Sequence, residues 1–312
     1  MDSTRRGLLF GVGAYGLWGS FPLYFPLLEP ASSLEILALR VVLSAVVVGL
    51  LLLGLRRGRA VAHLGRTALA RLALAGTVIA VNWGLYIWAV NHGHVIEASL
   101  GYFVNPLVTV AIGVVVLGER LRRVQWVAIG IGVLAVGVLT LDYGRPPWLS
   151  LVLALSFGTY GLLKKQVGVP AAEGLLVESG FLTLPALATL AVLAGQGTLS
   201  VGQHGAGHAA LLATAGLVTA GPLLLFAGAA SRLPLATVGL LQYMTPVLQL
   251  GVGVLVRHEP LPAGRLAGFA LVWVALAVLT VDGLRHRGRG AGAGAAGAPV
   301  EPVPAAMLTG AR

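Results

Sequence analysis

The sequence contains no cysteine, and only 10% of its 312 residues are charged. The absence of cysteine excludes disulfide bonds and thiolate metal ligands, but it does not identify a cellular compartment. Soluble domains contain about 25% charged residues, so the scarcity of charge excludes an ordinary soluble domain. Apolar residues make up 57% of the chain, and its mean hydropathy is +0.90. The composition therefore indicates a protein whose solvent is the lipid bilayer.

Long apolar runs recur along the whole chain, and a helix of about 20 residues crosses the hydrocarbon core of a bilayer. The runs are uniformly apolar instead of alternating, which favours spanning helices over barrel strands. The first run continues to about Leu28 without a short core and cleavage site, so we interpret it as a retained span. We predict an all-α polytopic membrane protein with ten transmembrane helices, at residues 7–28, 35–55, 72–91, 96–117, 124–141, 147–163, 172–195, 208–229, 235–256 and 264–282.

The placement of Lys and Arg predicts the orientation of these spans. With a cytoplasmic N-terminus, 17 of the 21 Lys and Arg residues fall in inner segments. Outer loops hold Arg145, Arg257 and Arg265, and Arg40 lies inside a span. Cytoplasmic loops of membrane proteins are enriched in these cations, so both termini are predicted to be cytoplasmic.

The chain contains an internal duplication. Residues 95–142 and 235–282 align without a gap at an offset of 140, so that Asn105-Pro106 corresponds to Thr245-Pro246. Because each copy would hold five spans, an odd number, the second copy must enter the membrane from the opposite side. We predict two inverted repeats, residues 1–142 and 143–282, followed by a disordered Gly/Ala/Pro tail over residues 283–312.

Two prolines occupy matching positions inside the predicted spans, and a polar pair precedes each of them. A proline removes one helical hydrogen bond and kinks the helix, so Pro106 and Pro246 are candidate hinges. Tyr102 with Asn105, and Gln242 with Thr245, are spaced i, i+3 and therefore share a helix face. These four residues are candidates for lining a central substrate cavity. The alternative is helix–helix packing, in which proline and polar residues are also common.

Further cavity candidates come from spans 1 and 3. Asn82 and Tyr86 lie four residues apart, and Tyr15 and Trp18 lie three apart, so each pair shares a helix face. Packing between helices is again the alternative. Gly11, Gly13, Gly16 and Gly19 form a small-residue stripe on span 1 that permits close helix contact.

Arg40 and Glu178 are the charges deepest within spans, where a charge costs about 2.5–3.5 kcal/mol on insertion scales. The spans that hold these two residues enter the membrane from opposite faces. Each charge lies near the face at which its span begins, so we do not expect the two to pair directly. Arg40 could reach outward to the interface or attract an anionic substrate group. Glu178 could attract a cation or carry a coupling proton. The alternative for each residue is that nearby polar groups of the protein bind its charged side chain, without a role in transport. Glu119 and Glu259, at the ends of two spans, are expected to be solvated.

The sequence offers no pattern typical of an enzyme or a cofactor protein. His92 and His94 have no third ligand nearby in the sequence, so a metal site is not predicted. The glycines of span 1 follow no strand, which argues against a phosphate-binding loop. We find no nucleophile with a general base, and we expect no cofactor and no nucleic-acid partner.

A continuous string in the first half carries a family resemblance. Residues 82–91, NWGLYIWAVN, run into Glu97 and then 98–107, ASLGYFVNPL, with Gly118-Glu119-Arg120-Leu121 and Gln125-Trp126 following. Glu35-Ile36-Leu37 with Arg40, and residues 273–277, WVALA, belong to the same pattern. The string resembles the RarD-type (chloramphenicol-sensitive protein) branch of the EamA, drug/metabolite transporter superfamily, over about residues 5–284.

The resemblance implies ten spans in two inverted EamA repeats, an inner-membrane location and transport of a small molecule, with export as the expected direction. It implies no established substrate. The sequence thus predicts a secondary transporter of a small amphipathic metabolite or drug, by alternating access, with proton coupling as one option. The alternatives are a passive facilitator and a non-transporting membrane scaffold or regulator.

Overall fold

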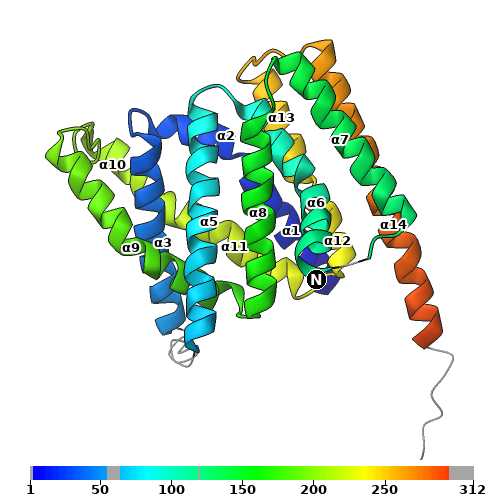
Figure 1. The fold of residues 1–312 in the computed structure, drawn as a ribbon. Coiled ribbons are helices and arrows are strands. Elements are labelled where there is room, and N and C mark those ends of the chain that lie inside the picture. The colour runs from blue at the N-terminus through cyan, green and yellow to red at the C-terminus, as the bar shows by residue number, and fades with distance from the viewer. Residues whose placement is uncertain (1–2, 55–63, 119, 295–312) are drawn as a thin grey trace, which may run out of the picture.

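The protein is built from helices joined by short connections (Figure 1). The structure is a computed structural model that describes residues 3–54, 64–118 and 120–294. No strand occurs within these residues. The elements are α1 (Ser3–Gly19), α2 (Phe21–Tyr24), η1 (Phe25–Leu28), α3 (Ser33–Gly54), α5 (Arg66–Asn91), α6 (Val95–Leu117), α7 (Arg123–Tyr143), α8 (Trp148–Val167), α9 (Ala171–Gly195), α10 (Gly205–Ala213), α11 (Ala215–Ala230), α12 (Leu235–Leu241), α13 (Met244–Leu255) and α14 (Ala263–Gly294).

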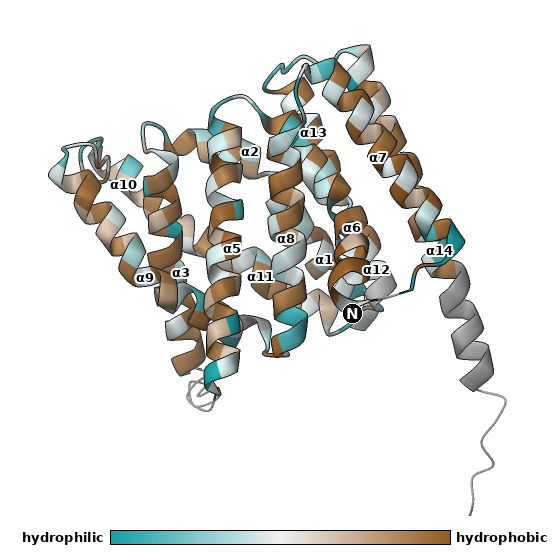
Figure 2. Ribbon diagram, viewed as in Figure 1, coloured by the Kyte–Doolittle hydropathy of each residue, from teal (hydrophilic) through white to brown (hydrophobic). Residues whose placement is uncertain are grey.

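Most of these helices are long and apolar enough to cross a membrane. Eight helical segments of the described chain meet this condition, and α1 with α2–η1, bent by 44°, would make a ninth. The eight do not include α8, which contains several Ser, Thr and Gly residues and ends near Lys164 and Lys165. Apolar residues cover the helices while polar residues gather in the connections (Figure 2). The chain is therefore an all-helical, multi-pass membrane protein.

The helix contacts come in corresponding pairs. Helix α1 packs on α11, and α8 packs on α5. Helix α3 packs on α11, and α9 packs on α5. Helix α13 contacts α1, and α6 contacts α8, while α3–α9 and α6–α13 contacts join the first half of the chain to the second. Each of the first three contacts thus has a counterpart. In the counterpart, every helix is replaced by the corresponding helix of the other half.

Helices α7 and α14 form an antiparallel pair at one end of the bundle (Figure 1). Their close approach depends on Gly268, where an added Cβ would lie 2.4 Å from Leu139 Cγ. An ion pair joins the two helices at each end. Arg265 Nε lies 3.2 Å from Asp142 Oδ2, and Arg122 pairs with Asp282. Asp142 and Asp282 correspond at the offset of 140, so the two ion pairs are reciprocal.

The small-residue stripe on α1 closely approaches α12 at one glycine and α13 at another. An added Cβ would lie 2.6 Å from Leu241 Cδ1 at Gly11 and 2.7 Å from Leu248 Cβ at Gly19. At Gly13 and Gly16 the nearest atoms are 3.4 and 3.6 Å away, which is ordinary contact distance. The close approach therefore depends on two of the four predicted glycines.

The two corresponding prolines have different effects on their helices. Helix α6 continues from Val95 to Leu117 with Pro106 inside it. In the second half the helix is interrupted, because α12 ends at Leu241 and α13 begins at Met244. Pro246 has no N–H to bond the Gln242 carbonyl, which instead accepts a hydrogen bond of 3.3 Å from Thr245 N. The symmetric pair of kinks expected from the sequence is thus one continuous helix and one broken one.

Two further expectations differ from the structure. Helix α14 continues to Gly294, so residues 283–294 are helical where a disordered tail was predicted. Leu284 and the three Arg residues of this segment favour helix, but its five glycines do not, so intrinsic propensity does not account for the extension. Residues 295–312 and Glu119 lie outside the described residues.

Glu259 is not merely solvated, because its carboxylate accepts hydrogen bonds from Val95 N and Ile96 N at 2.7 and 2.8 Å. A carboxylate is stabilised at a helix N-terminus by the helix dipole.

Candidate functional site

The polar candidates of α5 and α6 come together against α8. Asn82 Nδ2 donates to Leu153 O and to Ser156 Oγ, both at 2.9 Å, and Tyr102 Oη donates to Asn82 Oδ1 at 3.4 Å. The rings of Tyr86 and Tyr102 lie edge to face, 5.5 Å between centroids. Asn82 is fully buried, and both polar atoms of its amide are hydrogen-bonded. Its hydrogen bonds therefore link α5, α6 and α8. Tyr86 is equally buried, but its hydroxyl has no hydrogen-bond partner.

A corresponding group forms in α1, α11 and α13. Tyr15 and Trp18 share a face of α1, with ring centroids 5.5 Å apart, and both contact Phe226. Thr245 Oγ1 donates to the Tyr15 carbonyl at 2.9 Å, and Gln249 Nε2 donates to the Trp18 carbonyl at 3.2 Å. The sequence analysis missed Phe226 and Gln249. Extending the offset of 140 backward from the aligned block would have matched Phe226 to Tyr86.

Asn105 and Gln249 carry unpaired polar atoms on the two helices that join the halves. Asn105 is 5% exposed and lies next to Pro106 in α6, and its Oδ1 has no hydrogen-bond partner. Gln249 Oε1, in α13, is likewise buried without a partner. Gln242 is half-buried at the break between α12 and α13. An unsatisfied polar group inside a membrane protein costs several kcal/mol, so these two oxygens are candidates for contact with a bound molecule.

Arg40 does not reach outward to the interface, which was one of its two predicted roles. Its side chain is 2% exposed, and Nε donates to Thr219 Oγ1 of α11 at 3.0 Å. The guanidinium carbon lies 4.6 Å from the ring centroid of Trp83, 5.3 Å from that of Phe25 and 5.6 Å from that of Phe21. These contacts enclose the cation between α3, α5, α11 and the α2–η1 segment. Its Nη1 atom has no hydrogen-bond partner.

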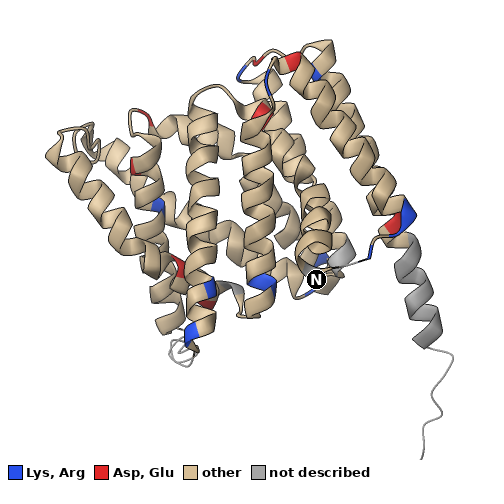
Figure 3. Ribbon diagram, in the orientation of Figure 1, with Lys and Arg blue, Asp and Glu red and all other residues tan. Residues whose placement is uncertain are grey.

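Glu178 is paired within the protein. Lys164 Nζ of α8 lies 2.6 Å from its Oε1, and Tyr160 Oη donates to its Oε2 at 3.2 Å. Glu178 is buried, whereas the Lys164 side chain is 20% exposed. Lys164 was predicted to lie in an inner loop, but α8 extends to Val167 and includes it. Arg40 and Glu178 do not pair with each other, and Figure 3 shows most of the other described charges toward the two ends of the bundle.

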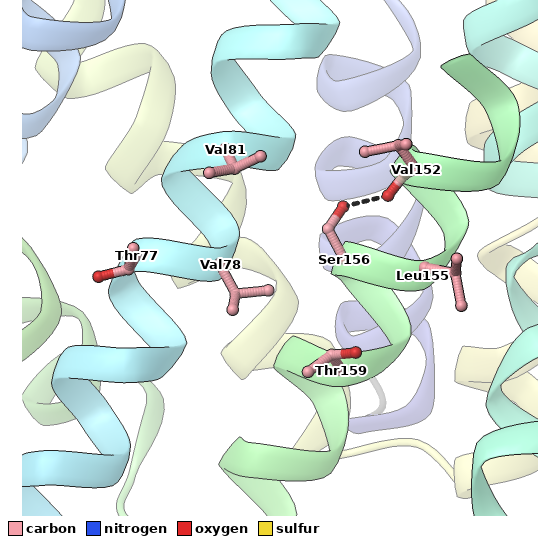
Figure 4. A pocket seen from close by; sticks show the side chains of 7 residues that line it. All are labelled: Thr77, Val78, Val81, Val152, Leu155, Ser156 and Thr159. Carbon is pink, nitrogen blue, oxygen red and sulfur yellow. Dashed lines mark hydrogen bonds between the residues drawn. The ribbon is translucent and has the colours of Figure 1, made fainter. Parts of the chain in front are cut away.

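A lateral groove of about 330 Å³ opens between α5 and α8 (Figure 4). Its walls are largely apolar, and Val81 and Leu155 are more than half exposed, so the groove lies on the outer surface of the two helices. Ser156 lines the groove and also accepts the hydrogen bond from Asn82. The remaining lining residues are Thr77, Val78, Val152 and Thr159. The groove therefore adjoins the buried group of α5, α6 and α8 through a single hydroxyl.

Other functional candidates are absent from the part of the chain that the structure describes. No group of three or more His, Asp and Glu residues there could hold a metal ion. His92 and His94 instead stack on the ring of Trp88, with centroids 4.8 and 5.4 Å away.

The sequence analysis did not predict the aromatic and polar residues around Arg40. Phe21, Phe25 and Thr219 are far from Arg40 along the chain, and no spacing rule connects them.

Comparison with known proteins identifies the family. Residues 5–141 match the EamA-like transporter family. A protein named RarD from Streptomyces exfoliatus is 58% identical over 286 residues, which cover 91% of each chain. The chain is a RarD-type member of the EamA superfamily. Membership of this family indicates a membrane transporter or permease.

A second relative and a solved structure are also similar to this chain. An uncharacterized transporter of Pseudomonas aeruginosa is 44% identical to this EamA-family chain over 285 residues, covering 91% of this chain and 96% of its own. A chain of known crystal structure superimposes with a TM-score of 0.58 at 21% identity, covering 89% of this chain and 98% of that one. At this level of identity the crystal structure supports the fold alone. This protein thus has the same fold as the crystallised protein over nearly the whole length of the latter.

Proposed function

We propose that this protein is a secondary transporter of the bacterial inner membrane that moves a small amphipathic molecule, in the direction of export, by alternating access. In this proposal the ten spans form two inverted five-helix repeats, residues 1–142 and 143–282, with both termini in the cytoplasm. The substrate binds between the repeats, against α1, α5, α6, α8, α11 and the broken α12–α13 helix.

The packing of α6 against α13 is the observation that carries this proposal. These helices correspond at the offset of 140, and they contact each other across the two halves. Each holds a buried carbonyl oxygen without a partner, on Asn105 and on Gln249. A protein that serves only as a scaffold gains nothing from such costly groups. A transporter can satisfy them when its substrate binds or when the helices move.

The exchange of helix contacts between the halves supports the inverted repeats. The contacts of α1 with α11 and α13 have counterparts in the contacts of α8 with α5 and α6. The reciprocal ion pairs of α7 and α14 follow the same relationship. Such symmetry provides two related ways to tilt one repeat against the other, which is the basis of alternating access in many transporters.

The test uses purified protein in liposomes loaded with buffer and incubated with a mixture of metabolites, with the lumen analysed by mass spectrometry. A secondary transporter should accumulate a compound above its external concentration when an ion gradient is imposed. Asn105→Ala and Gln242→Ala should lower that accumulation at least tenfold, while Gln196→Ala, which removes an exposed amide at the end of α9, should leave it unchanged.

The other outcomes separate the alternatives. Flux that only equalises concentrations, with or without the gradient, would indicate a passive facilitator. The absence of flux for every compound would leave a scaffold or regulator. Wild-type accumulation by both variants would show that the substrate does not bind at the junction of the repeats.

A further inference from the structure

Arg40 is a buried cation without a carboxylate partner. Eight acidic residues fall within the described part of the chain, and none of the ion pairs there includes Arg40. Glu97, Asp142, Glu178 and Asp282 each pair with another cation. Glu35 accepts hydrogen bonds from Ser200 and Val201. Glu259 binds the N-terminus of α6, Glu173 makes an interaction of its own, and Glu29 is exposed.

A guanidinium keeps its charge under all physiological conditions, so Arg40 cannot lower its burial cost by releasing a proton. Thr219 supplies one neutral acceptor, and the rings of Phe21, Phe25 and Trp83 supply cation–π attraction. Neither of these cancels the charge. Burial of a charge without a counter-ion is strongly unfavourable, and in membrane proteins such residues mark substrate or ion sites.

Two buried donors near the Phe25 ring have no hydrogen-bond partner. Arg40 Nη1 has no hydrogen-bond partner, and neither does Tyr86 Oη. The Phe25 ring contacts both, with its centroid 5.3 Å from the guanidinium carbon and 6.0 Å from the centroid of Tyr86. A carboxylate accepts several hydrogen bonds and neutralises the charge of a guanidinium.

We propose that Arg40 and Tyr86 form the binding site for the carboxylate of a small organic anion, whose planar apolar part packs among Phe21, Phe25 and Trp83. This inference rests on the proposed function, because it names the substrate class of the proposed transporter. Thr219 lies in the second half of the chain and the other residues in the first, so the site joins both halves. An anion bound here contacts elements that alternating access moves relative to one another.

The aromatic surroundings favour an organic carboxylate over an inorganic anion. A chloride ion would neutralise Arg40 but has no apolar part that could pack among the rings. A planar aromatic carboxylate uses both the charge and the rings. Its neutral amide has the same shape but no charge, which makes the amide a matched control.

The experiment measures binding to the full-length protein purified in detergent. The probes are benzoate and phenylacetate, each with its amide, and chloride as the inorganic anion. Trp83, whose ring lies 4.6 Å from the guanidinium carbon, reports binding through intrinsic fluorescence, and thermal unfolding supplies a second readout. We expect a saturable fluorescence change and a higher unfolding temperature with the carboxylates, and neither effect with the amides or chloride. Trp83→Phe should remove the fluorescence change.

Variants then assign the site. Arg40→Gln should abolish carboxylate binding, and Arg40→Lys should restore part of it. Tyr86→Phe, which removes only an unpartnered hydroxyl, should weaken the affinity about tenfold while the protein stays folded, so the test holds even if Arg40→Gln is unstable. Arg232→Gln changes an exposed arginine and should bind like the wild type.

Several results would overturn the inference. These are equal responses to acids and amides, a response to chloride alone, no response to either carboxylate, and wild-type binding by both Arg40→Gln and Tyr86→Phe. The proposed function fails separately. Accumulation of neutral or cationic compounds without carboxylate binding would overturn the anion site alone. Carboxylate binding without flux of any compound would overturn the transport function and leave the site in place.

Discussion

The interior charges of this protein are compensated in different ways. Arg40 is held by a threonine and aromatic rings, whereas Glu178 is neutralised by Lys164. Removal of one partner from a buried ion pair leaves an uncompensated charge, which destabilises a protein by about 3–5 kcal/mol. Because Lys164 is partly exposed, water can screen part of that cost.

We therefore expect Lys164→Met to lower the free energy of unfolding by about 2 kcal/mol, a value between those of exposed and fully buried pairs. The double variant Lys164→Met/Glu178→Gln should recover most of the loss, because no charge then remains in the pair. Thermal unfolding in detergent provides the measurement. Equal losses in the single and double variants would show that the ion pair contributes nothing.

The same pair gives a separate test of coupling in the liposome assay. If Glu178 carries the coupling proton, Glu178→Gln should make accumulation independent of an imposed pH gradient. The double variant with Lys164→Met should behave in the same way, even with its stability restored. Unchanged dependence in both would eliminate Glu178 from coupling and leave it a structural partner of Lys164.

At the scale of elements, glycines set how closely helices approach. Helix α14 contacts α7 through Gly268, where a side chain would meet Leu139 at less than normal contact distance. Gly137 lies in α7, and no atom lies within 4 Å of the position that its Cβ would occupy. The two helices therefore contain one glycine required by packing and one that packing does not require.

Gly268→Ala should destabilise the protein by about 1–3 kcal/mol, because the added methyl group forces α7 and α14 apart. Gly137→Ala should be neutral or stabilising by up to about 1 kcal/mol, since alanine favours the helix over glycine. Comparison of the two unfolding temperatures checks the packing. A stability change in Gly268→Ala no larger than that in Gly137→Ala would contradict the observed contact.

At the scale of the whole molecule, the arrangement of spans can be tested directly because the chain has no cysteine of its own. His92 lies between α5 and α6, and Gln166 lies at the far end of α8, and both are exposed. Three helices separate them, so the proposed topology places them on opposite sides of the membrane.

A membrane-impermeant maleimide should label His92→Cys in intact cells, and it should label Gln166→Cys only after permeabilisation. Labelling of both in intact cells would show that α8 does not span the membrane. Access to Gln166→Cys alone would show that the orientation is reversed. Mass spectrometry of the purified variants gives the labelled fraction.

The sequence predicted elements better than contacts between them. Hydropathy located the helices, because each apolar run must bury its backbone polar groups within itself in lipid. The break at Gln242 was not predicted, since Pro106 occupies a matching position and leaves α6 continuous. The surroundings of Arg40 depend on residues distant in the chain, such as Thr219, and no local spacing rule could assemble them. Tyr15 with Trp18 was predictable because both lie on one helix face.

The contrast between the continuous α6 and the interrupted α12–α13 has a consequence for the resting state. Two identical copies would give conformers of equal free energy facing either compartment, and therefore an even population. Because only the second copy is broken, the two conformers are no longer equivalent by symmetry. A difference of about 1.4 kcal/mol is enough for a tenfold bias. We therefore expect the unliganded protein to face mainly one compartment, before any solute or ion gradient acts on it.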